Sequence, residues 1–127
     1  MEERRRTVLV VEDDQAVRRM YRTALSFAGF DVIEADDAIS ALRSLDQYAI
    51  DIVVLDLVLP TLSGLAVQQE IAAHAHTASI PVVIVTGSDM SLDHVDVPCV
   101  LRKPILPDQL VSSVRTCLAS GARGVAS

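Results

Sequence analysis

Five short runs of apolar, mostly β-branched residues recur along the chain, and polar residues follow each run closely. At least three runs are continuously apolar rather than alternating, which is typical of strands buried on both faces of a parallel sheet. Parallel neighbours need crossover connections, which are right-handed and usually helical. The pattern therefore predicts an α/β domain with strands at Thr7–Val11, Asp31–Ala35, Asp51–Leu55, Pro81–Val85 and Pro98–Leu101.

Helical patterns separate these runs, with apolar residues three or four positions apart on one face. The predicted helical stripes run from Val17 to Ala28, from Ala38 to Leu45, from Gly64 to His74 and from Leu106 to Leu118. Only positions 87–97 lie between the fourth and fifth strands, so a helix over Ser88–Asp93 is expected to be short or irregular. The alternation predicts a doubly wound parallel sheet with helices on both faces.

Length, composition and charge narrow the class of protein. The 127 residues, half of them hydrophobic, fit a single domain over residues 1–127, with a core of about residues 6–119 and a frayed tail at Ser120–Ser127. A formal net charge of −6 argues against direct nucleic-acid binding. No apolar stretch reaches the roughly 20 residues that span a bilayer, and no signal peptide pattern precedes the first strand, so we expect a cytoplasmic protein.

Two residue pairs are predicted to carry no chemistry. Cys99 and Cys117 form no motif, and we expect small buried side chains in a reducing compartment. His74 and His76 are two positions apart near the end of a predicted helix. That spacing does not place them on one helical face, so a metal site there is not expected.

The polar residues that follow the strands predict the site, because ligands of open α/β sheets bind outside the carboxyl ends of the strands. In strand order they are Glu12-Asp13-Asp14, Asp36-Asp37, Asp56, Thr86-Gly87 and Arg102-Lys103-Pro104. Asp14 is expected to cap the next helix. Two carboxylates about 4 Å apart repel by roughly 4 kcal/mol at an effective dielectric near 20, so a cluster of three needs a cation. Mg²⁺ suits such oxygen ligands.

A carboxylate beside such a cation can attack a phosphoryl donor and form an aspartyl-phosphate. Catalysis of phosphoryl transfer is mainly positioning and charge neutralisation. A lysine and a hydroxyl donor on the same edge of the sheet meet those needs. The residue types therefore predict a phosphoryl-accepting site at Asp56, with Thr86 and Lys103 beside it.

The chain resembles the receiver domain of two-component response regulators over about residues 6 to 119. The matching segments are Val8–Asp14, Val53–Pro60, Ser63-Gly64, Val85–Gly87 and Arg102–Pro104. The resemblance implies a flavodoxin-like (CheY-like) sheet of five strands in the order 2-1-3-4-5. It also implies transfer of a phosphoryl group from a sensor histidine kinase or a histidine phosphotransfer protein to Asp56.

The resemblance assigns roles residue by residue. The ligands of Mg²⁺ (or Mn²⁺) would be Asp13 and Asp56 directly, Glu12 through a water, and Val58 through its backbone carbonyl. Thr86 would hydrogen-bond the phosphoryl group, and Lys103 would pair with it. A cis peptide bond before Pro104 would aim Lys103 into the site.

Two departures from the family pattern affect the expected output. Val100 stands three residues before Lys103, where receivers usually carry Tyr or Phe, so the ring movement of the usual switch is missing. Thr86 and Lys103 are 17 positions apart (103 − 86), which is shorter than usual in the family. The usual relay through the fourth helix, fifth strand and fifth helix is therefore in doubt. Val58 offers no side-chain hydrogen bond to an attacking water, so slow autodephosphorylation is expected.

Partners and competing functions stay open. Contacts with the kinase are expected from Ala16, Val17, Met20 and Ile105–Leu106, whereas the output partner is open and a phosphorylation-dependent homodimer is allowed. Beyond self-phosphorylation and autodephosphorylation at Asp56, no enzyme activity is expected. The alternative is an aspartyl-phosphate hydrolase of the haloacid dehalogenase type, which needs a second Asp where this chain has Val58. The chain is either a stand-alone receiver or the N-terminal receiver of a larger regulator.

Overall fold

A computed structural model describes residues 5–60, 63–87 and 99–120 of the chain. Five parallel strands form one sheet in the order β2-β1-β3-β4-β5, which confirms the predicted fold class and strand order. The strands are β1 Thr7–Val11, β2 Asp31–Ala35, β3 Ile52–Asp56, β4 Val82–Thr86 and β5 Cys99–Arg102.

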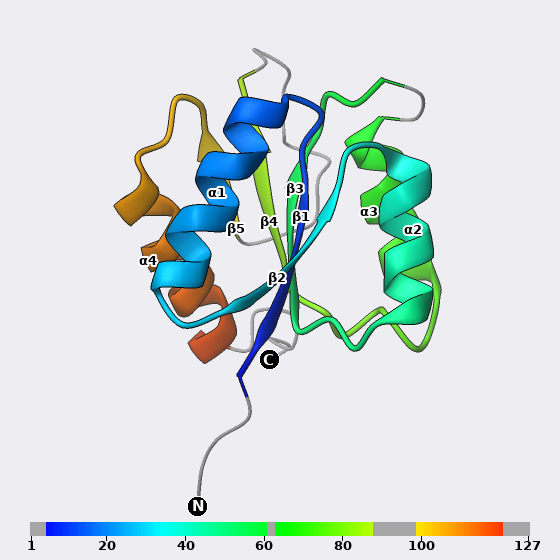
Figure 1. Ribbon diagram of the computed structural model, residues 1–127. Helices are drawn as coiled ribbons and strands as arrows, with labels where there is room; N and C mark the ends of the chain where they lie inside the picture. The colour runs from blue at the N-terminus through cyan, green and yellow to red at the C-terminus, as the bar shows by residue number, and fades with distance from the viewer. Residues whose placement is uncertain (1–4, 61–62, 88–98, 121–127) are drawn as a thin grey trace, which may run out of the picture.

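Four helices of the described residues cover the two faces of the sheet (Figure 1). Helices α1 (Gln15–Phe27) and α4 (Pro107–Ser120) lie on one face, and α2 (Ala38–Gln47) and α3 (Gly64–Ala73) lie on the other. The helix labelled α4 is the last of the predicted helices. The expected short helix at Ser88–Asp93, Pro98 of the fifth predicted strand, and residues 121–127 of the predicted tail lie outside the described residues.

The core is divided by the sheet, because successive strand side chains point to opposite faces. On the α2 and α3 side, Leu9, Val53 and Ile84 are fully buried. On the α1 and α4 side, Val10 and Val83 are fully buried. All five residues of β3 and of β4 are buried, which explains why those runs are continuously apolar until their last residue.

The first three helices begin at the carboxyl edge of the sheet and are capped by side chains there. As predicted, Asp14 caps α1, its Oδ1 accepting a hydrogen bond of 3.0 Å from the Val17 amide. Asp37 caps α2 and Ser63 caps α3 in the same way. These caps satisfy amide groups that lack intrahelical partners and set where each strand-to-helix turn ends.

The strands β3 and β4 begin and end one residue later than predicted, and β5 ends one residue later, so each of the three ends on a polar residue. In the parallel register, Asp56 pairs with Val85 and Thr86 pairs with Arg102. Backbone pairing continues through these positions irrespective of side-chain polarity. Asp56 and Thr86 are therefore held by the sheet itself rather than by the loops that follow it.

The expectation of two independent, reduced cysteines is wrong in this structure. Cys99, at the start of β5, and Cys117, on the buried face of α4, are joined by a disulfide. Their Cα atoms are 6.7 Å apart, within the range that disulfides bridge. The strand and helix pack against each other, and this packing brings together two residues whose spacing carries no motif.

Candidate functional site

Three carboxyl groups converge at the carboxyl ends of the neighbouring strands β1 and β3. Carboxylate oxygens of Glu12, Asp13 and Asp56 lie within 4.8 Å of one another. Glu12 and Asp56 are almost completely buried, with 1% and 4% of their surface exposed, whereas Asp13 is exposed. The structure thus brings together the three acids that the sequence singled out.

Lys103 enters this cluster from the end of β5. Its Nζ lies 2.8 Å from Oε1 of Glu12 and 3.2 Å from Oδ2 of Asp56. Its backbone N–H donates to the carbonyl of Thr86 at 2.9 Å, and its peptide bond to Pro104 is cis, as the resemblance implies. Lys103 is also the one lysine in the sequence.

Burial and hydrogen bonds act in opposite directions on the pKa values of these groups. Burial raises the pKa of the Glu12 carboxyl, the charge of Asp56 adds to this, and hydrogen bonds from Lys103 and Asp14 lower it in part. Burial lowers the pKa of Lys103, but its hydrogen bond to Glu12 and the charges of Asp56 and Glu12 outweigh burial and raise that pKa overall. Lys103 therefore stays protonated, and one ammonium faces three carboxyl groups.

The donor set fits a divalent cation. Carboxylate oxygens are hard ligands, and three carboxyl groups share this cluster with one lysine. Both oxygens of Glu12 are already engaged, Oε1 with Lys103 and Oε2 with the Asp14 amide at 3.1 Å. The exposed carboxylate of Asp13 is therefore better placed for direct ligation than Glu12 is, whereas both oxygens of Asp56 also accept hydrogen bonds, from the Val58 amide and from Lys103.

Backbone amides that follow β3 donate to Asp56 and Leu57. The Val58 amide donates to Oδ1 of Asp56 at 2.9 Å, and the Gly64 amide donates to the carbonyl of Leu57 at 2.8 Å. A Cβ atom on Gly64 would lie 2.5 Å from the Cα of Leu57 and would overlap the carbonyl oxygen of Asp56. The start of α3 can approach Asp56 this closely because residue 64 is glycine.

Thr86 on β4 and Val100 on β5 have different surroundings. Thr86 is completely buried at the end of β4, beside the strand that carries Lys103. Val100 pairs with Ile84 and packs, partly buried, against the aliphatic core beneath α2 and α3. The position that usually carries a mobile ring thus contributes to the core in this chain.

The predicted kinase-facing surface needs one correction. Leu106 is 67% exposed and Met20 is 37% exposed, so both are accessible. Ile105 is only 7% exposed and belongs to the core on the α1 and α4 side. The turn after the cis bond to Pro104 directs one apolar residue inward and the next outward.

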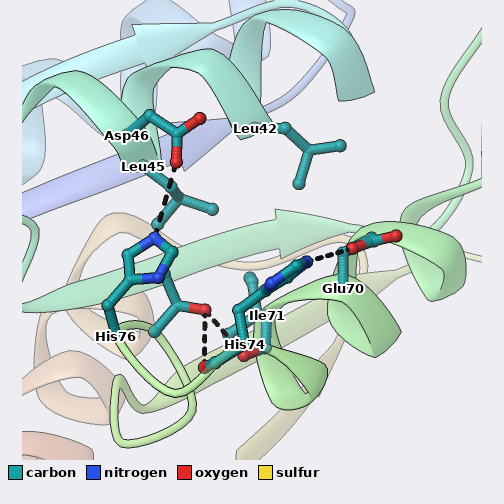
Figure 2. A pocket seen from close by; sticks show the side chains of 8 residues that line it. Leu42, Leu45, Asp46, Glu70, Ile71, His74 and His76 are labelled. Carbon is teal, nitrogen blue, oxygen red and sulfur yellow. Dashed lines mark hydrogen bonds and ion pairs between the residues drawn. The ribbon is translucent and has the colours of Figure 1, made fainter.

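Away from the acidic cluster, a cavity with both apolar and polar lining lies between α2 and α3 (Figure 2). There His74 Nε2 lies 2.8 Å from Oε1 of Glu70, and His76 Nε2 lies 3.4 Å from Oδ1 of Asp46. His74 is the C-cap of α3 and His76 follows it, so the argument from helical faces does not apply to this pair. Among the described residues, the group whose ligand atoms converge for a metal comprises Glu12, Asp13 and Asp56.

Known proteins resemble this chain in both sequence and structure. The sequence model of the response regulator receiver domain matches residues 8–115. The sensory transduction protein RegX3 of Mycolicibacterium smegmatis is 32% identical over 121 residues, which cover 91% of this chain and 52% of that protein. The phosphate regulon transcriptional regulatory protein PhoB of Klebsiella pneumoniae is 33% identical over 118 residues, which cover 89% and 52%. The chain thus spans about half the length of these curated relatives.

Solved structures match the fold over nearly its whole length. A CheY-like response regulator receiver domain protein from Methanospirillum hungatei JF-1 superposes with a TM-score of 0.85 at 22% identity, covering 93% of this chain and 97% of that one. A putative response regulator from Chloroflexus aurantiacus J-10-fl gives a TM-score of 0.85 at 26% identity, covering 91% and 99%.

In the described part of this chain, no helix is long and apolar enough to cross a membrane.

Proposed function

This chain belongs to the response regulator receiver domain family, and we propose that it accepts a phosphoryl group on Asp56. One observation carries the assignment of the acceptor. The Asp56 carboxylate is fixed at the end of a buried strand, 3.2 Å from the chain's one lysine and beside two further carboxyl groups. The family match gives no support to the hydrolase alternative, which also lacks its second Asp at Val58.

The acidic cluster would hold Mg²⁺ or Mn²⁺ through Asp13 and Asp56, with Glu12 acting through a water and Val58 through its carbonyl. When bound, the ion supplies positive charge opposite the oxygens of the transferring phosphoryl group.

In the proposed reaction, a carboxylate oxygen of Asp56 attacks the phosphorus of a phosphohistidine on a sensor kinase or a phosphotransfer protein. The new O–P bond forms as the P–N bond breaks, and the imidazole nitrogen keeps the electron pair. Lys103 already lies next to the attacking carboxylate and would then pair with the negatively charged oxygens of the transferred phosphoryl group. Thr86, at the end of the adjoining strand, would donate a hydrogen bond to the same group.

The test is phosphoryl uptake from labelled acetyl phosphate in the presence of Mg²⁺. Asp56→Asn should abolish labelling, because the amide cannot act as the nucleophile. Asp36→Asn, which changes an exposed aspartate after β2, is the matched control and should label like the unaltered protein. Labelling of Asp56→Asn at full stoichiometry would refute the assignment.

The extent of the domain, 1–127 with a core of about 6–119, stays a prediction, as do the cytoplasmic location, the output partner and a phosphorylation-dependent homodimer. The matched relatives are about twice as long as the aligned region, so activity beyond phosphoryl acceptance is left to direct measurement.

A further inference from the structure

Arg18 on α1 connects the acidic loop to the neighbouring strand β2. Its Nη1 donates to the backbone carbonyl of Glu12 at 2.9 Å, and its Nε lies 3.1 Å from Oε1 of Glu34. Only 16% of its side chain is exposed. The helical stripe of α1 gave no reason to single out this residue.

The contact with Glu12 completes a set of bonds around the first residues of the loop. The Glu12 amide donates to the carbonyl of Ala35 at 3.1 Å, and the Arg18 amide donates to the carbonyl of Asp14 at 2.9 Å. The Arg18 side chain binds one backbone acceptor between these points, the carbonyl that belongs to the Glu12–Asp13 peptide. The orientation of that peptide decides where the exposed Asp13 carboxylate is directed.

We propose that Arg18 is a positioning residue for the cation site, acting on Asp13 through the Glu12 carbonyl, with Glu34 orienting the guanidinium. This inference rests on the proposed function of the acidic cluster. Outer-shell groups of this kind typically change metal affinity by about 10- to 100-fold when they are removed. Arginine suits the role because its planar fork serves two acceptors in different directions at once.

The direction of the change in Mg²⁺ affinity distinguishes a positioning role of Arg18 from an effect of its charge alone. A guanidinium near the cluster repels a cation, so removal of its charge alone would strengthen Mg²⁺ binding. Loss of positioning would weaken it. Arg22 offers a matched control, because its Nε also pairs with Glu34, at 3.4 Å, whereas no contact of Arg22 with the Glu12 carbonyl is found among the described residues.

The experiment measures the Mg²⁺ dissociation constant of the unphosphorylated protein by isothermal titration calorimetry. Arg18→Gln should weaken Mg²⁺ binding about tenfold, whereas Arg22→Gln should leave the constant within about twofold of the unaltered protein. Labelling by acetyl phosphate gives a second readout. In Arg18→Gln the Mg²⁺ concentration for half-maximal rate should rise, while the rate at saturating Mg²⁺ is retained.

Arg18→Lys covers the case in which Arg18→Gln does not fold, which circular dichroism in EDTA would reveal. One ammonium cannot serve both acceptors, so this variant should bind Mg²⁺ more weakly than Arg22→Gln does. Affinity in Arg18→Gln equal to or tighter than in Arg22→Gln, or unchanged affinity in Arg18→Lys, would overturn the role of Arg18. An absence of Mg²⁺ binding in the unaltered protein would instead overturn the proposed cation site.

Discussion

Replacement of Asp13 by Asn should stabilise the protein in the absence of divalent cations. The Asp13 carboxylate is exposed and lies within 4.8 Å of carboxylate oxygens of both Glu12 and Asp56. Within the described residues, no hydrogen bond or ion pair of this carboxylate is found that the substitution would break. Asn is nearly isosteric, so the main change is the removal of one negative charge from a crowded cluster.

The structure bounds the size of this effect. Two unit charges 4.8 Å apart repel by roughly 3.5 kcal/mol at an effective dielectric of 20 and by roughly 0.9 kcal/mol in water. Asp13 interacts with two such neighbours, but its exposure places it near the aqueous limit, and Lys103 offsets part of the repulsion. We therefore expect the free energy of unfolding to rise by about 1–2 kcal/mol in EDTA.

The assay is urea unfolding followed by circular dichroism, with EDTA and with saturating Mg²⁺. A ligand that binds only the folded state at 100 times its dissociation constant stabilises by about 2.7 kcal/mol. The unaltered protein should gain this increment, and Asp13→Asn should gain little, so Mg²⁺ should reverse the order of stability. Asp36→Asn should stay within about 0.5 kcal/mol of the unaltered protein in both conditions.

An Asp13→Asn protein that is no more stable than the unaltered one in EDTA would refute the repulsion argument. An equal gain from Mg²⁺ in both proteins would refute the ligand role of Asp13. The two results are independent, because the first concerns the metal-free cluster and the second concerns the cation.

Three further outcomes follow from the geometry. Gly64→Ala should lower the free energy of unfolding by about 2 kcal/mol or more, because the added Cβ overlaps backbone atoms of Asp56. Gly87→Ala should change it by less than about 1 kcal/mol, because the added Cβ would meet Lys103 at an ordinary 3.6 Å. Equal urea midpoints of the two variants would contradict this. The raised pKa of Lys103 means that its contribution to stability is complete below the ordinary value of 10.5 and is lost as pH rises through the folded-state pKa. The free energy of unfolding should therefore fall above about pH 10. It should fall less steeply in Lys103→Met, where only the burial of Tyr21, which raises the pKa of Tyr21 to about 12, still acts in the same direction. Identical pH profiles of the two proteins would contradict the pairing of Lys103 with the carboxylates. Val58, which is 57% exposed, offers no polar group to a water, so the aspartyl-phosphate should decay slowly and Val58→Asn should hasten its decay; loss of label within seconds in the unaltered protein would rule this out.

The fold could be predicted from the sequence because β3 and β4 are buried on both faces and their sequences are therefore continuously apolar. Their runs are apolar until the last residue, and that residue is where the prediction slipped by one position. Asp56 and Thr86 are polar, yet both are buried and paired in the sheet. A strand that ends inside a site cannot be delimited by hydrophobicity alone.

Contacts between residues far apart in the chain were harder to predict. The sequence placed Glu12 and Lys103 at one edge of the sheet, but 91 positions separate them, and their direct 2.8 Å contact depends on how β5 ends. The disulfide depends similarly on the packing of α4 against β5. No sequence pattern marks the contact of Arg18 with Glu12, because the acceptor is a backbone carbonyl, which every residue has.

The replacement of the usual ring by Val100 has a structural consequence that the sequence alone left open. Val100 pairs with Ile84 and packs into the core, so rotation of an aromatic side chain cannot link the site to the surface at this position. The main chain already provides another connection. Thr86 accepts a hydrogen bond from the Lys103 amide, and Lys103 Nζ reaches the acceptor carboxylate. We therefore expect a change of charge at Asp56 to act on the ends of β4 and β5 through Lys103, whose side chain lies in the site and whose backbone amide bonds to the last residue of β4.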